Sequence, residues 1–140
     1  MKHLIVIAII SLSFGQAVAQ EENTLKIIIK NFSSSNGKVK VGLYNSKENY
    51  MGSFFMYDDA EVMDEKEVEL IFENVPSGEY AFSIYHDENN NGELDKNIVG
   101  IPTEDYAFSN NANGRFGPPK YEECVFKVDQ NLVVQTININ

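Results

Sequence analysis

Hydrophobic and polar side chains alternate along much of this chain. In residues 24–30 every second position is apolar, at Leu25, Ile27 and Ile29. Strand-like sequence of the same kind recurs in five further stretches, which are residues 38–43, 67–73, 80–84, 124–128 and 132–140. A period of two predicts strands that turn one face to a hydrophobic core and the other to water.

Short segments rich in Gly, Pro, Ser, Asn or Asp separate these stretches, at residues 33–37, 76–78 and 129–131. Such residues favour turns between strands. Several short strands joined by turns predict an all-β fold, an antiparallel β-sandwich of about seven strands with one long loop. The length of the chain predicts a single domain, residues 20–140.

The first 19 residues have the pattern of a secretory signal peptide. Lys2 precedes an apolar run at residues 4–10, and Ala17-Val18-Ala19 resembles a cleavage site, which makes Gln20 the expected first residue of the mature protein. The alternative is an N-terminal membrane anchor, for which the apolar run is too short. The sequence therefore predicts an exported protein, periplasmic or extracellular, with no membrane span after cleavage.

The chain is strongly acidic, with a formal net charge of −10. This charge argues against a nucleic-acid partner and against anionic membrane surfaces. Cys124 is the only cysteine, so no disulfide can form within the chain. We expect a buried, inert thiol on a strand. Stability must then come from the core and from any bound cation.

Residues 45–65 break the alternation and carry four aromatic side chains between positions 50 and 57. This segment is expected to form a short helix or a loop across one end of the sandwich. Its aromatic side chains either pack the connection onto the core or form a patch that faces a ligand.

The longest loop-like segment, residues 85–123, contains the clearest chemical motif. Asp87, Asn89 and Asn91 occupy alternate positions and Gly92 follows, as in the first half of an EF-hand loop, D-x-[DN]-x-[DN]-G. Short oxygen-bearing side chains at every second position of a tight turn point toward one centre. Ca²⁺ takes about 6–8 oxygen ligands, so the motif predicts a Ca²⁺ site.

The rest of the expected ligand set is less complete. Glu93 would supply its carbonyl oxygen, and Asp95 would bind directly or through water. Ile98 stands where an EF-hand places its bidentate Glu. Glu104 or Asp105, or water, would have to complete the shell, and the Ca²⁺ would bind weakly. The alternative is a metal-free loop of Asx-turns, which uses the same residue types.

No catalytic motif stands out in the sequence. His86 lies beside Asp87, but alternation along a strand places neighbours on opposite faces, so His86 is expected to be structural. Zinc is not expected, because one Cys and one His remain after the leader. The chain is therefore not expected to be an enzyme.

Residues 109–119 are expected to form an ordered loop that folds back over the cation-binding loop. Five of its residues favour positive φ angles, namely Asn110, Asn111, Asn113, Gly114 and Gly117. Arg115 is the only arginine of the chain. Its planar guanidinium is suited to binding a carboxylate.

The segment from Asn74 to Phe126 resembles a family of secreted bacterial proteins known as domain-of-unknown-function family 2141. The shared features are a P-x-G-x-Y-A strand at 76–81, an H-D-x-N-x-N-G-x-x-D loop at 86–95, and the later run of residues Gly100, Pro102, Glu104, Tyr106, 108–112, Gly114 and 117–119. Tyr121 and Cys124 replace the usual Phe and Ala. The resemblance implies an exported protein with an immunoglobulin-like or transthyretin-like sandwich, and it implies no activity.

Three functions fit the sequence. The first is a binding or interaction module stabilised by Ca²⁺, with an unknown protein or glycan partner. The second is a small-ligand carrier that uses residues 50–57 together with the long loop. The third is a glycan hydrolase with paired carboxylates, such as Asp95 and Glu104, which would have to flank a cleft.

Overall fold

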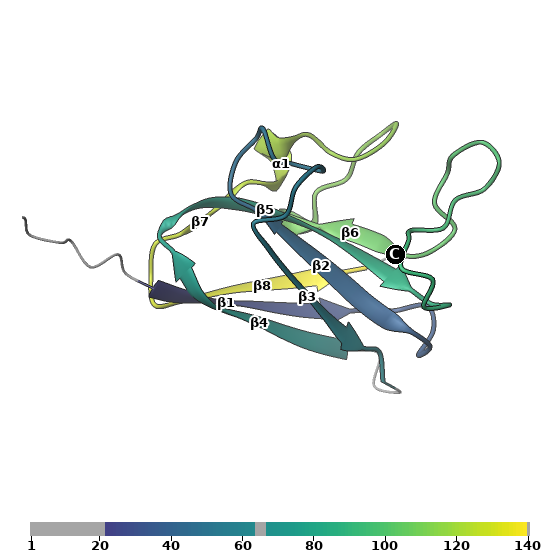
Figure 1. Ribbon diagram of the computed structural model, residues 1–140, viewed down its shortest axis with the longest axis horizontal. Coiled ribbons are helices and arrows are strands. Elements are labelled where there is room, and N and C mark those ends of the chain that lie inside the picture. The colour runs from purple at the N-terminus through teal and green to yellow at the C-terminus, as the bar shows by residue number, and fades with distance from the viewer. Residues whose placement is uncertain (1–21, 64–66, 140) are drawn as a thin grey trace, which may run out of the picture.

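The computed structural model describes residues 22–63 and 67–139. Within these residues the fold is all-β, with eight strands in two sheets and two short helical turns (Figure 1). None of the described helices is long and apolar enough to cross a membrane. The expected leader, residues 1–19, lies outside the described residues, and its cleavage stays a prediction.

One sheet has three strands, with β1 in the middle. In order across the sheet they are β4 (Glu67–Pro76), β1 (Glu22–Lys30) and β8 (Leu132–Asn138). β1 pairs antiparallel with β4 but parallel with β8. The expectation of a purely antiparallel fold is therefore wrong. The turn at residues 129–131 carries the chain from one sheet to the other, and β8 then enters beside β1 in the same direction.

The other sheet is organised around the long strand β5. Its strands are β3 (Met56–Glu61), β2 (Lys38–Tyr44), β5 (Gly78–Asp87), β6 (Tyr106–Phe108) and β7 (Phe126–Val128). β5 pairs along one edge with β2, while β7 and β6 share its other edge, at the beginning and toward the end of the strand. The long loop at residues 88–105 therefore connects the end of β5 to its neighbour β6.

Two expectations about local structure are corrected. The strand expected at residues 124–128 begins as a helical turn, α1 (Tyr121–Cys124), and only β7 is extended. Glu123 accepts a hydrogen bond from the N–H of Lys120, which favours a helical start at this point. Within residues 45–65 a short helix or a loop was expected. Residues 45–55 form turns without a helix, which agrees with a loop, but residues 56–61 form strand β3, which was not expected.

A single hydrophobic core lies between the two sheets. Leu25, Ile27 and Ile29 of β1 belong to the same buried cluster as Val41 of β2 and Phe82 of β5. Burial alternates along β1, most of β4 and the first half of β2, which explains why these strands were predictable. Because the strands form the core, the loop that follows β5 can hold polar side chains for a functional site.

A second, smaller apolar cluster covers the outer face of the five-stranded sheet. Ala81, Phe108 and Cys124 are its buried members, with Tyr50 and Tyr121 packed against them. Cys124 is buried as expected, and burial raises the pKa of its thiol. The Tyr50 hydroxyl lies 3.3 Å from the Cys124 sulfur. One aromatic side chain of the 50–57 segment thus packs the connection onto the sheet.

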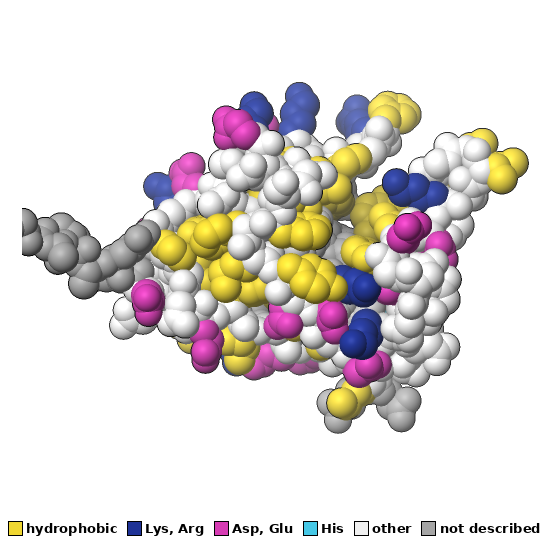
Figure 2. All heavy atoms as spheres, viewed as in Figure 1, with side chains coloured by type: hydrophobic (Ala, Val, Ile, Leu, Met, Phe, Trp, Pro, Cys, Tyr) yellow, Lys and Arg dark blue, Asp and Glu magenta, His cyan; other side chains and the backbone are white. Residues whose placement is uncertain are grey.

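The other aromatic side chains of that segment stay partly in water. Phe54, Phe55 and Tyr57 are 40–51% exposed. Figure 2 shows apolar side chains gathered over the middle of this face and again at the ends of two projecting loops. The outer surface of this sheet is therefore more apolar than the net charge of the chain suggests.

Candidate functional site

The loop that follows β5 is built around the side chain of Asp87, which is fully buried. Its Oδ1 accepts a hydrogen bond from the N–H of Asn91 (3.0 Å), and its Oδ2 accepts one from the N–H of Gly92 (2.9 Å). Gly92 has a φ of 87°, which glycine adopts at little cost. From β2, the Lys40 ammonium lies 3.1 Å from Asp87 Oδ2. Asp87 thus closes the turn, and Lys40 neutralises it.

The charges of this pair shift each other's pKa. Burial alone would raise the pKa of Asp87. The hydrogen bonds from Lys40, Gly92 and Asn91 outweigh burial, so the pKa lies below its ordinary value. The hydrogen bond to Asp87 raises the pKa of Lys40 above its ordinary value. Both groups are therefore ionised at neutral pH.

The side chains of Asn89, Asn91 and Asp95 contact one another across the loop. The Asn89 amide donates to Asp95 Oδ2 (2.6 Å), and the Asn91 amide donates to Asp95 Oδ1 (2.9 Å). The Oδ1 atoms of both Asn residues accept main-chain N–H groups two residues later in the chain, in Asx-turns. The donor set predicted for a cation is thus gathered in one place.

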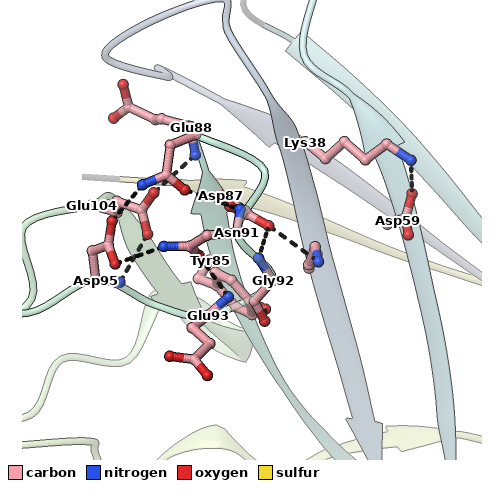
Figure 3. Close-up of polar contacts among 12 residues, drawn as sticks. Lys38, Asp59, Tyr85, Asp87, Glu88, Asn91, Gly92, Glu93, Asp95 and Glu104 are labelled. Carbon is pink, nitrogen blue, oxygen red and sulfur yellow. Dashed lines mark hydrogen bonds and ion pairs between the residues drawn. The ribbon is translucent and has the colours of Figure 1, made fainter.

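Glu104 joins the two ends of this loop. Its Oε1 accepts the N–H of Glu88 and its Oε2 accepts the N–H of Asp95, both at 2.9 Å (Figure 3). Residues 88 and 95 lie on either side of the Asx-turns, so one carboxylate fixes both. Glu104 was one of the candidates to complete the cation's ligand shell, and the structure places it as a buried clamp on the main chain.

The structure brings most of the expected Ca²⁺ ligands together in the loop. The side chains of Asp87, Asn89, Asn91 and Asp95 are brought together, whereas the Glu93 side chain is exposed and Glu93 offers only its main chain to the loop. The hydrogen bonds within the loop are those of a metal-free Asx-turn, which was the alternative interpretation. The donor set fits Ca²⁺ in type, with two carboxylates and several neutral oxygens. Ca²⁺ binding itself stays a prediction.

The carboxylate pair considered for glycan hydrolysis has a different use in the fold. Both oxygens of Glu104 accept main-chain N–H groups, and both oxygens of Asp95 accept side-chain amides. A general acid must instead be free to exchange a proton with a substrate. All four oxygens of the pair accept hydrogen bonds within the loop, so the geometry does not favour the hydrolase alternative.

The loop at residues 109–119 does not fold over the Asx-turns as expected. The Asn111 amide donates to the carbonyl of Thr136, and Asn111 Oδ1 accepts the N–H of Asn138, so the loop is attached to β8. β8 is an edge strand, and these amides satisfy main-chain groups that the sheet leaves unpaired. Asn110, Asn111 and Gly117 have the expected positive φ, but Asn113 and Gly114 do not.

Two projecting loops enclose a cleft. One is residues 94–102, here called the arm, and the other is residues 114–118. The cleft has a volume of about 520 Å³ and is lined by apolar groups of both loops, of Met51 and of β6. The arm contributes Val99 and Ile101, and the 114–118 loop contributes Phe116 and Pro118. In Figure 1 the two loops project on the same side of the molecule.

The cleft also carries positive charge in an otherwise acidic protein. Lys96 of the arm and Arg115 of the opposite loop both line it. Arg115 forms no hydrogen bond or ion pair with any residue that the structure describes, so the expected carboxylate partner is not found there. Its guanidinium is available to a ligand.

Sequence reasoning missed two features of this region. The first is the pairing of Lys40 with Asp87. The sequence places Lys40 on the polar face of a predicted strand, but its pairing with Asp87 depends on the register between β2 and β5. The cleft was missed because its walls lie in loops, where hydrophobic periodicity is absent.

Comparison with known proteins gives a family without a known activity. No curated protein and no solved structure matches the chain. A family profile described as "Uncharacterized protein conserved in bacteria (DUF2141)" matches residues 27–136, which run from β1 into β8 and include the loop, its clamp and the cleft. The chain belongs to this bacterial family, DUF2141.

Proposed function

We propose that this protein is a small-ligand binding module whose cleft takes an apolar group that carries an acid. The observation that supports this proposal is the cleft between the arm and the 114–118 loop. Its volume of about 520 Å³ lies within the range of small-molecule sites. Apolar walls with a few polar groups are typical of such sites.

The exposure of the two loops points in the same direction. Val99 on the arm is 72% exposed and Phe116 on the opposite loop is 104% exposed, and both line the cleft. Covering large apolar side chains of this kind with a ligand removes apolar surface from water and stabilises the complex by about 25 cal/mol per Å² buried. Lys96 and Arg115 would bind the acid group, and the guanidinium of Arg115 would donate two parallel hydrogen bonds to it.

The experiment uses the fluorescent probe 8-anilinonaphthalene-1-sulfonate, which combines aromatic rings with one sulfonate. Wild type is expected to bind it saturably. Ile101→Ser removes apolar wall and Arg115→Gln removes charge, and each is expected to weaken binding about tenfold, which corresponds to 1.4 kcal/mol.

The matched control is Ile98→Ser, because Ile98 belongs to the same arm and is more exposed, yet it does not line the cleft. The proposal requires that this variant bind the probe like wild type. An equal loss in Ile98→Ser and Ile101→Ser would mean that the probe senses exposed apolar surface in general. No saturable binding to wild type would refute the proposal.

We further propose that Ca²⁺ binds the loop of Asp87, Asn89, Asn91, Glu93 and Asp95 at the base of the arm. The two carboxylates and the amide oxygens support this assignment, and Lys40 beside Asp87 opposes it. The binding is expected to be weak, with Kd roughly 10⁻⁴–10⁻³ M. Titration calorimetry with Ca²⁺ that gave no heat of binding would refute it.

The finer fold assignment is also a proposal. We propose a β-sandwich of the immunoglobulin-like or transthyretin-like kind, because one core includes side chains from both sheets. An experimental structure in which the sheets did not face each other would contradict it.

We propose that the protein is exported and that residue 20 begins its mature form, because residues 1–19 carry a signal-peptide pattern. N-terminal sequencing of the protein from its native cells tests this proposal. A mature chain that still began at Met1 would refute it.

A further inference from the structure

We propose that His86, Glu88 and Asp105 form a binding site for a divalent transition-metal ion of the zinc type. Zinc was not expected from the one Cys and one His of the sequence, because that count leaves out the two carboxylates that the fold brings beside His86. The site is separate from the Asx-turn loop, and the proposal does not depend on the cleft or on Ca²⁺. One ligand atom from each of the three side chains lies within 4.8 Å of the other two.

The fold brings these three residues together from both ends of the long loop. His86 is near the end of β5, Glu88 follows the strand, and Asp105 comes directly before β6. The N–H of His86 donates to the carbonyl of Asp105 (2.9 Å), which fixes the two segments relative to each other. Neither carboxylate is fully exposed, and His86 is 0% exposed.

The imidazole of His86 has one nitrogen without a partner. Its Nε2 lies 2.5 Å from the carbonyl oxygen of Asn36, and a carbonyl can only accept, so Nε2 carries the hydrogen. In the neutral ring Nδ1 then presents a lone pair. Nδ1 is buried and has no hydrogen-bond partner among the described residues.

Nδ1 lies close to negative charge. Glu88 Oε1 lies 4.0 Å from Nδ1, and Asp105 completes the group. A buried polar atom without a partner is costly, and a lone pair beside two carboxylates is more so. A cation placed between the three atoms removes both costs. A metal ion does so while the ring keeps its hydrogen bond to Asn36.

The surroundings hold each ligand as in a metal site. A metal-binding His usually donates its other N–H to a carbonyl or a carboxylate, which fixes the ring, and Asn36 accepts in this way. Ser34 donates its hydroxyl to Glu88 Oε2 (2.8 Å), and the N–H of Ser33 donates to Asp105 Oδ2 (2.9 Å). All three supporting groups come from residues 33–36.

The donor set selects the type of metal. One imidazole and two carboxylates give a charge of −2 and a nitrogen ligand, which suits Zn²⁺ better than the all-oxygen preference of Ca²⁺. Ligands about 2.1 Å from a tetrahedral zinc ion are about 3.4 Å apart, so small side-chain movements close the site. Water would fill the fourth position.

This site is distinct from the Asx-turn loop because alternation separates them. His86 faces the core side, against Phe32, whereas Asp87 faces Lys40 on the outer side. The neighbours Glu104 and Asp105 also contact different parts of the fold. Glu104 accepts a hydrogen bond from Glu88 at the start of the Asx-turn loop, and Asp105 accepts one from Ser33.

The test is titration calorimetry of the full chain with Zn²⁺ in Ca²⁺-free buffer at pH 7. Wild type is expected to bind one equivalent at this site. Glu88→Gln and Asp105→Asn keep the size of the side chain and one acceptor oxygen but remove the charge, and each is expected to weaken binding at least tenfold. Glu93→Gln and Asp95→Asn are the matched controls from the neighbouring loop and are expected to bind Zn²⁺ like wild type.

Nuclear magnetic resonance of the ¹⁵N-labelled imidazole gives a second measurement, with His86→Gln identifying its signals. Zn²⁺ is expected to shift Nδ1 and leave Nε2 protonated. Absence of Zn²⁺ binding, or unchanged binding in both Glu88→Gln and Asp105→Asn, would overturn the proposal. So would an imidazole with hydrogens on both nitrogens that Zn²⁺ does not displace, because a proton would then occupy the position of the metal. Asp95→Asn can lose Ca²⁺ binding without any change in Zn²⁺ binding, so the Ca²⁺ proposal and the Zn²⁺ proposal are tested independently.

Discussion

At the scale of single residues, the end of β5 shows how adjacent side chains acquire different tasks. His86 and Asp87 are both buried, yet one contacts the turn at residues 33–36 and the other contacts Lys40. A buried carboxylate is tolerated because it has one cationic partner and two main-chain donors. We therefore expect the Lys40–Asp87 ion pair to stabilise the fold by an amount that depends on pH.

Lys40→Met is therefore expected to lower the free energy of unfolding at pH 7 by about 1–3 kcal/mol, because it leaves Asp87 buried without its ion pair. The pKa of Asp87 is depressed in the native protein, so this stabilisation is present above the unfolded pKa, near 3.8, and is lost as pH falls through the lower folded value. The difference between variant and wild type should thus narrow below about pH 4. Urea unfolding at pH 7 and at pH 3 measures it.

Lys38→Met is the matched control, because Lys38 lies on the same face of β2 and pairs with the more exposed Asp59. Its effect should be much smaller, since exposed pairs contribute little. If Lys40→Met cost the same at both pH values, the loss would come from side-chain packing and not from the charge of Asp87.

Single residues were partly predictable. The D-x-N-x-N-G spacing identified the residues that meet in the loop, because that spacing specifies a local turn. The partners of those residues were not predictable, since Lys40 and Glu104 reach the loop through strand pairing and a distant segment. Glu104 was named for its carboxylate, and its use as a main-chain clamp has no signature in the sequence.

At the scale of elements, the turn at residues 33–37 packs closely against the end of β5. A Cβ at Gly37 would lie 2.0 Å from the carbonyl oxygen of Asp87 and 2.7 Å from Cα of Glu88. Gly37 also has a φ of 70°. The turn therefore depends on glycine both for its backbone angle and for its contact with the loop.

Gly37→Ala and Gly100→Ala form a matched pair that separates these two needs. Both positions have positive φ, but a Cβ at Gly100 would meet nothing within 4 Å. Positive φ costs Ala about 1–2 kcal/mol, and crowding adds about 1–3 kcal/mol. Thermal and urea unfolding should show a larger loss for Gly37→Ala. Equal losses would mean that the two segments move apart freely, and the proposed metal site would then lack its rigid support.

Elements were predictable where burial alternates and were missed elsewhere. β1, β2, β4 and β5 follow from their patterns. β3 has the sequence MYDDAE, in which the acidic residues interrupt the hydrophobic alternation that would predict a strand. β6 is only three residues long. The sequence predicted a strand where Cys124 ends a helical turn, and antiparallel pairing where β8 pairs parallel with β1. Both features depend on contacts between distant parts of the chain.

At the scale of the whole molecule, one core joins both sheets, so an event at one loop should change the stability of the entire fold. Side chains of β1 and β5 belong to the same buried cluster. A domain of this size with one core usually unfolds in a single transition. A ligand that binds only the native state then raises the melting temperature of the whole chain.

Ca²⁺ is therefore expected to stabilise the protein globally by RT ln(1 + [L]/Kd), which is about 1.4 kcal/mol at tenfold over Kd. Melting in millimolar Ca²⁺ should occur a few degrees above melting in EDTA. Asp95→Asn is expected to remove the difference, because it removes one of the two charges of the proposed ligand set. Glu93→Gln should retain it, since only the main-chain carbonyl of residue 93 is used. Equal melting temperatures for wild type in both buffers would mean that Asp87, Asn89, Asn91 and Asp95 form Asx-turns without a metal.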